Sequence, residues 1–382
     1  MDRRGTGPKA EESVRLCIYL HSTEIGGMEI SLSTLLGYLD GHYEVTLLGV
    51  APAVLAAVAE TRPGTVVSLV PRVKSKADVR AIAAHVRTVR ALRPDVLMAS
   101  MAQLFDAQYG ALAGLLNRVP TVAVVHCVLP TVSRSQEFLF RQMFRRLRAL
   151  GGVSRSVCEA TEQAMGLAPG AATVLYNGVP DTNCRGSSVS IDHSAPPQAP
   201  TVGAVGRLTP EKGYDVLIRA MALLPGCRLV LLGEGPERAA LTALARQLGM
   251  EDRVELAGWV TAPWTDQFQF DVLATPSRVE GFGLVAVEAL MAGIPVVASR
   301  LGGLVEVLRE GETGLLVAPG DPVVLAHALR ELLTDPVKRG AMGRRGRDDV
   351  RQRFSPAAMA SAYDAFLGSA ISGRFTSPPG DR

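Results

Sequence analysis

The segment DVLATPSRVEGFGLVAVEALMAGIPVVAS, residues 271–299, carries the pattern that decides the fold. It opens with a short run typical of a buried strand, passes a glycine-bordered turn into an apolar helical stretch, and ends in a second strand, IPVVAS. Short apolar strands joined by a helix are typical of parallel βαβ units. The segment therefore predicts an α/β domain with a parallel sheet covered by helices.

The same alternation extends through most of the chain. Helices are expected from Glu29, over residues 76–92 and after Ser154, and the second of these places an apolar stripe on Val79, Ile82, Ala83, Val86 and Val89. Further strands are expected at 14–21, 43–50, 95–99, 121–126, 172–176, 201–206, 227–233 and 253–258. The fold class is therefore α/β, with two Rossmann-like, doubly wound domains in tandem facing a cleft.

The domain boundary is expected where this periodicity stops. Residues 181–200 fill with Ser, Pro and Gly, as an exposed connection does. We expect a first domain at 1–183, a linker at 184–200, a second domain at 201–354, a final docking helix at 355–368 and a flexible tail at 369–382.

Composition excludes several classes of protein. The 382 residues are 47% hydrophobic and 20% charged, and the 40 Lys and Arg nearly balance the 37 Asp and Glu, which argues against disorder and against a nucleic-acid binder. The five cysteines form no C-x-x-C pair, which favours a reduced compartment without disulfides. Neither a signal peptide nor an apolar run of about 18 residues is found, so we expect a cytoplasmic protein.

One stretch of the sequence has a pattern that would also suit peripheral contact with a membrane. Residues 133–150, as a helix, place Arg134, Arg141, Arg145 and Arg148 near one face and an apolar stripe on another. Such a helix could lie on anionic lipid. We favour the alternative, in which the apolar stripe belongs to the core and the arginines face solvent or an acidic acceptor.

The densest candidate site surrounds two glutamates of the opening segment. Gly281 and Gly283 expose the free N–H groups at the start of a helix, which suits a phosphate or a sugar. Glu288 lies among apolar residues of that helix and needs donors, which a ribose diol would supply. Glu280 lies in the preceding loop and could hold hydroxyls of a second sugar. The alternatives are a core carboxylate at Glu288 and a solvated, helix-capping acid at Glu280.

Two cations follow the first strand of the second half. Arg207 and Lys212 flank the turn of VGRLTPEKG, where they could neutralise a diphosphate without a metal. The alternative is an ordinary solvated loop.

Three residues of the first half also follow strands. Gly26 and Gly27 occupy the first strand-to-helix turn, where a backbone can approach a phosphate or sugar closely, although a plain turn is the alternative. His126 ends a strand and could transfer a proton or donate a hydrogen bond near a reacting sugar, or simply bond the backbone. Finally, no D-x-D triplet occurs, so we expect no metal cofactor.

Taken together, five segments resemble glycosyltransferase family 4, whose members have the GT-B fold. The resemblance covers residues 14–367 and rests on GGME (26–29), VGRLTPEKG (205–213), LLGEGPER (231–238), LAGWV (256–260) and the pair Glu280 and Glu288. Departures occur at Cys127, where an acidic residue is frequent, and at YNGVPD (176–181), and both concern the acceptor side.

The resemblance implies a role for each candidate residue. Arg207 and Lys212 would bind the donor diphosphate, Glu288 the ribose, and the backbone at Val260 the base. Glu280 would lie near the donor sugar with the amides of a donor-binding loop, and His126 would be a second catalytic candidate. The final helix would cross back to the first domain. The other implied donor-binding residues are Gly26, Gly27, Gly281, Phe282, Gly283 and Leu284.

The expected activity is a metal-independent, retaining transfer of a hexose or N-acetylhexosamine. The donor would be a nucleotide-diphosphate sugar, with UDP favoured by its frequency in the family, and it would be a co-substrate and not a cofactor. The acceptor would be a small soluble molecule such as a natural-product aglycone or aminocyclitol. A nucleotide-sugar 2-epimerase, a transferase acting on a lipid-linked or polyol-phosphate acceptor, and a binding module without turnover are the alternatives.

Overall fold

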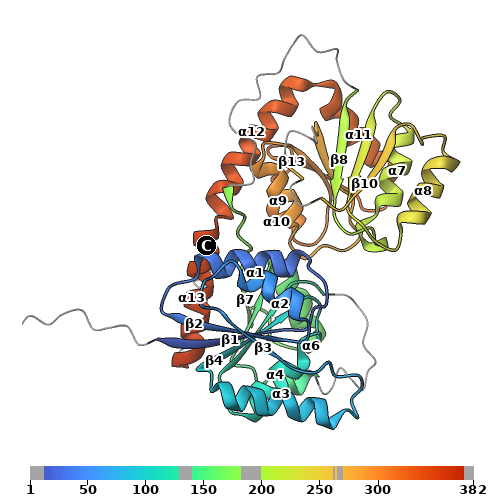
Figure 1. Ribbon diagram of the computed structural model, residues 1–382. Helices are drawn as coiled ribbons and strands as arrows, with labels where there is room; N and C mark the ends of the chain where they lie inside the picture. Colours follow the sequence, from blue (N-terminus) through green and yellow to red (C-terminus); the bar gives the residue numbers. More distant parts are fainter. Residues whose placement is uncertain (1–12, 129–139, 182–198, 261–262, 265–269, 374–382) are drawn as a thin grey trace, which may run out of the picture. The chain divides into compact units, whose positions relative to one another are not determined.

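The computed structural model describes residues 13–128, 140–181, 199–260, 263–264 and 270–373. The chain divides into two compact units (Figure 1). The first unit comprises residues 1–152, 158–175 and 359–382, and the second unit comprises residues 153–157 and 176–358.

The first unit contains a parallel, seven-stranded sheet in the order β3-β2-β1-β4-β5-β6-β7. Its central strands are runs of Val, Ile, Leu and Ala that are buried along their whole length, as strands covered on both faces must be. The strands are β1 (Val14–Leu20), β2 (Tyr43–Gly49), β3 (Val66–Leu69), β4 (Val96–Met101), β5 (Thr121–Val125), β6 (Ala149–Gly152) and β7 (Ala172–Val174).

Helices cover both faces of this sheet. Figure 1 shows α1 (Gly27–Tyr38) and α2 (Pro52–Ala59) on one face and α3 (Val79–Leu92) and α4 (Gln108–Leu116) on the other. Helix α6 (Arg155–Met165) begins within the segment that belongs to the second unit.

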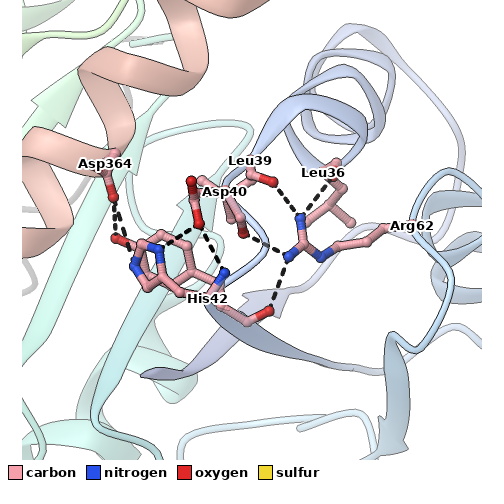
Figure 2. Close-up of polar contacts among 7 residues, drawn as sticks. Leu36, Leu39, Asp40, His42, Arg62 and Asp364 are labelled. Atoms are coloured by element: carbon pink, nitrogen blue, oxygen red, sulfur yellow. Dashed lines mark hydrogen bonds and ion pairs between the residues drawn. The ribbon is translucent and has the colours of Figure 1, made fainter. Parts of the chain in front are cut away.

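The last helix, α13 (Pro356–Ser372), belongs to the first unit from Met359 onward. Its Asp364 accepts a hydrogen bond of 2.8 Å from the Tyr43 hydroxyl at the start of β2 (Figure 2). His42 lies beside the same carboxylate and bonds Asp40 through Nδ1 at 2.7 Å.

The second unit contains a parallel, six-stranded sheet in the order β10-β9-β8-β11-β12-β13. Alternate residues of its strands pack against α7, α8 and α11 in one apolar core, while α9 and α12 pack together. The strands are β8 (Thr201–Val205), β9 (Arg228–Leu232), β10 (Val254–Gly258), β11 (Val272–Thr275), β12 (Val296–Ser299) and β13 (Gly314–Val317). The helices are η2 (Pro210–Lys212), α7 (Tyr214–Ala222), α8 (Arg238–Gln247), α9 (Leu284–Met291), α10 (Leu304–Val307), α11 (Pro322–Thr334) and α12 (Pro336–Arg353).

The sheets confirm the predicted α/β class and the expected strands, but three strands were not predicted: β3, β6 and β13. The expected apolar stripe on α3 is wrong at Val79, which is 69% exposed. The helix begins only after Asp78, whose carboxylate accepts from the Ala81 amide, and its buried side chains are Ala81, His85 and Val89. His85 occupies the centre of this face because its Nε2 bonds the buried Tyr19 hydroxyl at 3.0 Å.

The expected helix over 133–150 is also wrong at its carboxyl end. The helical residues stop at Phe144, a turn follows, and β6 begins at Ala149. Phe140 and Phe144 are buried, and Phe140 stacks on Phe105 with ring centroids 4.0 Å apart, so these two apolar residues belong to the core. Residues 129–139, which include Arg134, lie outside the described residues.

The expected boundaries differ from the two units. Tyr176–Asp181 belong to the second unit, although the first domain was expected to run to 183, and α13 continues through residues 369–372 of the expected tail. Nearly all of the expected linker, and the tail beyond residue 373, lie outside the described residues. Among the described helices, none has the combined length and apolar character needed to cross a bilayer.

Candidate donor-binding site

The predicted candidates of the second unit all follow the carboxyl ends of its strands. Arg207 follows β8, Val260 follows β10, and Glu280 follows β11. In a parallel sheet these ends share one edge, which is where ligands collect in open α/β folds. The loops after β8 and β9 touch, since a Cβ at Gly233 would stand 1.9 Å from the Gly206 carbonyl oxygen.

Lys212 and Glu280, selected separately from the sequence, form an ion pair. The Lys212 ammonium lies 2.8 Å from Glu280 Oε2, and the side chains are 26% and 14% exposed. Ser277 Oγ donates to the same carboxylate oxygen at 3.2 Å. Glu280 is therefore not a freely solvated loop acid, and the pair presents one cation and one carboxylate at the edge of the sheet.

The glycine loop between Glu280 and α9 is held rigidly. Gly283, the N-cap of α9, has φ +99°, and a Cβ at Gly303 would stand 2.5 Å from Phe282 Cα. Ser154, fully buried, donates through Oγ to the Gly281 carbonyl at 2.7 Å. The first N–H groups of a helix have no intrahelical partner, so the start of α9 at Leu284 is suited to bind an anion.

Glu288 lies one turn further along α9 and is half-buried. Burial raises the pKa of its carboxyl group to about 7, against the opposing effect of the Trp264 hydrogen bond. Trp264 Nε1 donates to Glu288 Oε2 at 3.1 Å. This partner was not predicted, because nothing in the sequence near Trp264 relates it to a carboxylate 24 residues away.

The candidates of the first unit lie at the carboxyl ends of β1 and β5. Gly26 is the N-cap of α1, and its amide already donates to Glu29 Oε2 at 2.9 Å, a backbone-to-carboxylate bond that was not predicted. Glu29 is 3% exposed. Gly27, the first residue of the helix, is exposed. Of the two glycines, Gly27 is the one that leaves its surface open to a ligand.

His126 directly follows β5 and is half-buried. Desolvation lowers the pKa of its imidazole to about 4, so the ring is neutral at physiological pH. Its Nε2 lies 3.3 Å from the hydroxyl of Ser100 on the neighbouring strand. A neutral ring suits hydrogen bonding to a sugar better than charge neutralisation.

The described part of the chain contains no group of three or more His, Cys, Asp or Glu side chains that could hold a metal ion. Of the predicted candidates at this edge of the second sheet, two are cations: Arg207, which is exposed, and Lys212. These two side chains and the amides at the start of α9 are groups that can bind an anion.

Two family models match the chain. The model described as glycosyltransferase family 4 matches residues 25–183, and the one described as glycosyl transferases group 1 matches residues 190–349. A 2-deoxystreptamine glucosyltransferase of Streptomyces kanamyceticus is 31% identical over 294 residues, which is 70% of this chain and 76% of that protein.

A lipopolysaccharide core biosynthesis glycosyltransferase, LpsE of Rhizobium meliloti, is 37% identical over 187 residues. That match covers 48% of this chain, which spans about half (55%) of the relative's length. Among solved structures, Anabaena Alr3699/HepE in complex with UDP-glucose has a TM-score of 0.81 at 23% identity, over 93% of this chain and 100% of that one. This last similarity concerns the fold.

Proposed function

The chain belongs to glycosyltransferase family 4, with the GT-B fold, and from this premise we propose that it transfers a hexose or N-acetylhexosamine from a nucleotide-diphosphate sugar to an acceptor hydroxyl. The observation that carries the proposal is the convergence of Lys212, Glu280 and the start of α9 at one edge of the second sheet. An ammonium and unpaired helix amides are ligands for a diphosphate, and a neighbouring carboxylate accepts from sugar hydroxyls.

Glu288 would bind the ribose of the nucleotide. Among the described residues Trp264 alone donates to the Glu288 carboxylate, which leaves acceptor capacity for two vicinal hydroxyls. Arg207 and the backbone at Val260 would contact the diphosphate and the base. UDP is the proposed nucleotide, in line with the UDP-glucose bound in the Anabaena structure.

The leaving nucleoside diphosphate would be neutralised by Lys212 and by the dipole of α9, without a metal ion. The reaction would retain the anomeric configuration. Adding a chelator should leave turnover unchanged, whereas loss of turnover that added Mg²⁺ or Mn²⁺ restores would contradict metal independence.

The proposed acceptor is a small polyhydroxylated molecule, such as an aminocyclitol or a natural-product aglycone. The support is the 2-deoxystreptamine glucosyltransferase, which aligns over more of its own length than LpsE does.

A donor and acceptor panel read by mass spectrometry tests the function. The purified protein is incubated with UDP- and GDP-sugars, each with and without candidate acceptors. Release of nucleotide that depends on an acceptor, with a product heavier by one sugar, is the expected result. A donor whose sugar is changed while the nucleotide stays attached would support an epimerase instead, and binding without turnover would support a binding module.

A further inference from the structure

Tyr214, the first residue of α7, has a fixed position behind the candidate site. The residue is 4% exposed and belongs to the apolar core of the second unit. The preceding residue, Gly213, has φ +67°, and a Cβ there would stand 2.1 Å from the Pro276 carbonyl oxygen. The chain therefore enters α7 in one conformation, and the burial of the ring determines where the hydroxyl lies.

That hydroxyl reaches the edge of the sheet that carries the donor-binding candidates. It lies 2.8 Å from the point where a Cβ at Gly206 would stand, and the same point is 3.8 Å from Lys212 Cε. Burial, and then the nearby Glu280 carboxylate, raise the pKa of the Tyr214 phenol, which keeps its proton at physiological pH. The hydroxyl is thus a neutral donor beside the Lys212 and Glu280 pair.

Within the described ranges, no protein atom forms a hydrogen bond with this hydroxyl. The hydroxyl oxygen is not fully enclosed by the protein either. The tip of the side chain therefore keeps contact with solvent. Gly206 contributes to this access, because any side chain at that position would cover the oxygen.

We propose that the Tyr214 hydroxyl donates a hydrogen bond to a phosphate oxygen of the nucleotide-diphosphate donor, next to Lys212. The inference rests on the proposed function. An O–H group held in place by a buried ring loses little entropy on binding, and a hydrogen bond to a charged oxygen is among the stronger ones. Glu280 is the competing acceptor, and its Oε2 already accepts from Lys212 and Ser277.

Tyr214→Phe removes only the oxygen and leaves the buried ring in place. We would titrate the variant by calorimetry with UDP or GDP, whichever binds the unaltered protein, and with the matching nucleoside. The Kd for the diphosphate should rise about tenfold, which corresponds to about 1.4 kcal/mol, while the Kd for the nucleoside stays within about twofold. Tyr363→Phe, which removes the oxygen of another buried tyrosine in the first unit, should change neither value.

Two results would overturn the inference while leaving the proposed function intact. One is an unchanged Kd for the diphosphate in Tyr214→Phe when Lys212→Ala weakens it. The other is an equal loss for diphosphate and nucleoside, which would indicate a disturbed core. If the unaltered protein binds neither nucleotide, the proposed function itself fails.

Discussion

At the scale of single residues, Glu288 should make nucleotide binding depend on pH. Burial holds the pKa of its carboxyl group at about 7 in the free protein, and only the ionised form accepts from both ribose hydroxyls. Affinity should therefore fall as the pH drops through 7, and the Kd for UDP should be about tenfold higher at pH 6 than at pH 8.

Glu288→Gln supplies the control for this prediction, because an amide does not titrate. The pH dependence that remains in this variant belongs to the nucleotide's own phosphate and is subtracted. Equal slopes in the two proteins would show that Glu288 does not bind the ribose as a carboxylate.

His126 should act without changing its charge. Since desolvation lowers the pKa of its ring to about 4, kcat/KM should show no ionisation of this group between about pH 5.5 and 8. His126→Ala should lower kcat by about 100-fold, the lower range for a lost hydrogen-bonding or proton-transferring group. Steady-state rates of the two proteins across this pH range are the measurement, and a kcat within about threefold of the unaltered value would exclude the role.

At the scale of elements, the glycine loop before α9 depends on close backbone contact. Gly303→Ala would place a Cβ 2.5 Å from Phe282 Cα and displace the loop that presents the helix amides. The Kd for UDP, measured by calorimetry, should rise at least about tenfold, since a displaced anion site loses charge-assisted bonds. Gly340→Ala on α12, where the added Cβ meets only an arginine nitrogen at 3.5 Å, is the control and should bind normally.

The docking of α13 on the rest of the first unit should depend on the hydrogen bond that Tyr43 donates to Asp364. Tyr43→Phe removes the donor to Asp364 and should lower the free energy of unfolding by about 1 kcal/mol. Tyr38→Phe, which alters an exposed tyrosine of the same unit, is the control. Hydrogen exchange of the α13 amides should accelerate in the first variant alone, and equal exchange in both would show that the contact contributes little.

Some helices and strands could be predicted from the sequence and others could not. Mostly apolar strands such as β1 and β12 are recognisable because local composition and burial agree. The break after Phe144 was missed because its residues keep a helical period, while β6 forms only by pairing with β5 and β7. His85 was missed for a similar reason, since its buried partner Tyr19 lies 66 residues earlier.

At the scale of the whole molecule, the chain passes between the two units at four places: after residues 152, 157, 175 and 358. The segment 153–157 shows why a single boundary could not be found from sequence. Ser154 bonds the glycine loop through the Gly281 carbonyl, and the amides of Arg155 and Ser156 donate to Glu306, each at 2.9 Å. These contacts join residues about 130 to 150 positions apart, which no local pattern reveals.

More of the candidate site than of the unit boundaries could be predicted from the sequence. The site residues follow strands and are of types that bind phosphates and sugars. Arg207, Lys212 and Glu280 were selected on that basis. Trp264 and Tyr214 were not, since the apolar bodies of both side chains belong to the buried interior and only their polar ends reach the site.

The proposed function requires that the second unit bind a nucleoside diphosphate at the sheet edge that carries Lys212 and the start of α9. A crystal structure of the protein with UDP tests it most directly. We expect diphosphate oxygens within hydrogen-bond distance of Lys212 Nζ and of the amides at Gly283 and Leu284, with the ribose hydroxyls on Glu288. Nucleotide bound elsewhere, with the Lys212–Glu280 ion pair unchanged, would contradict this inference.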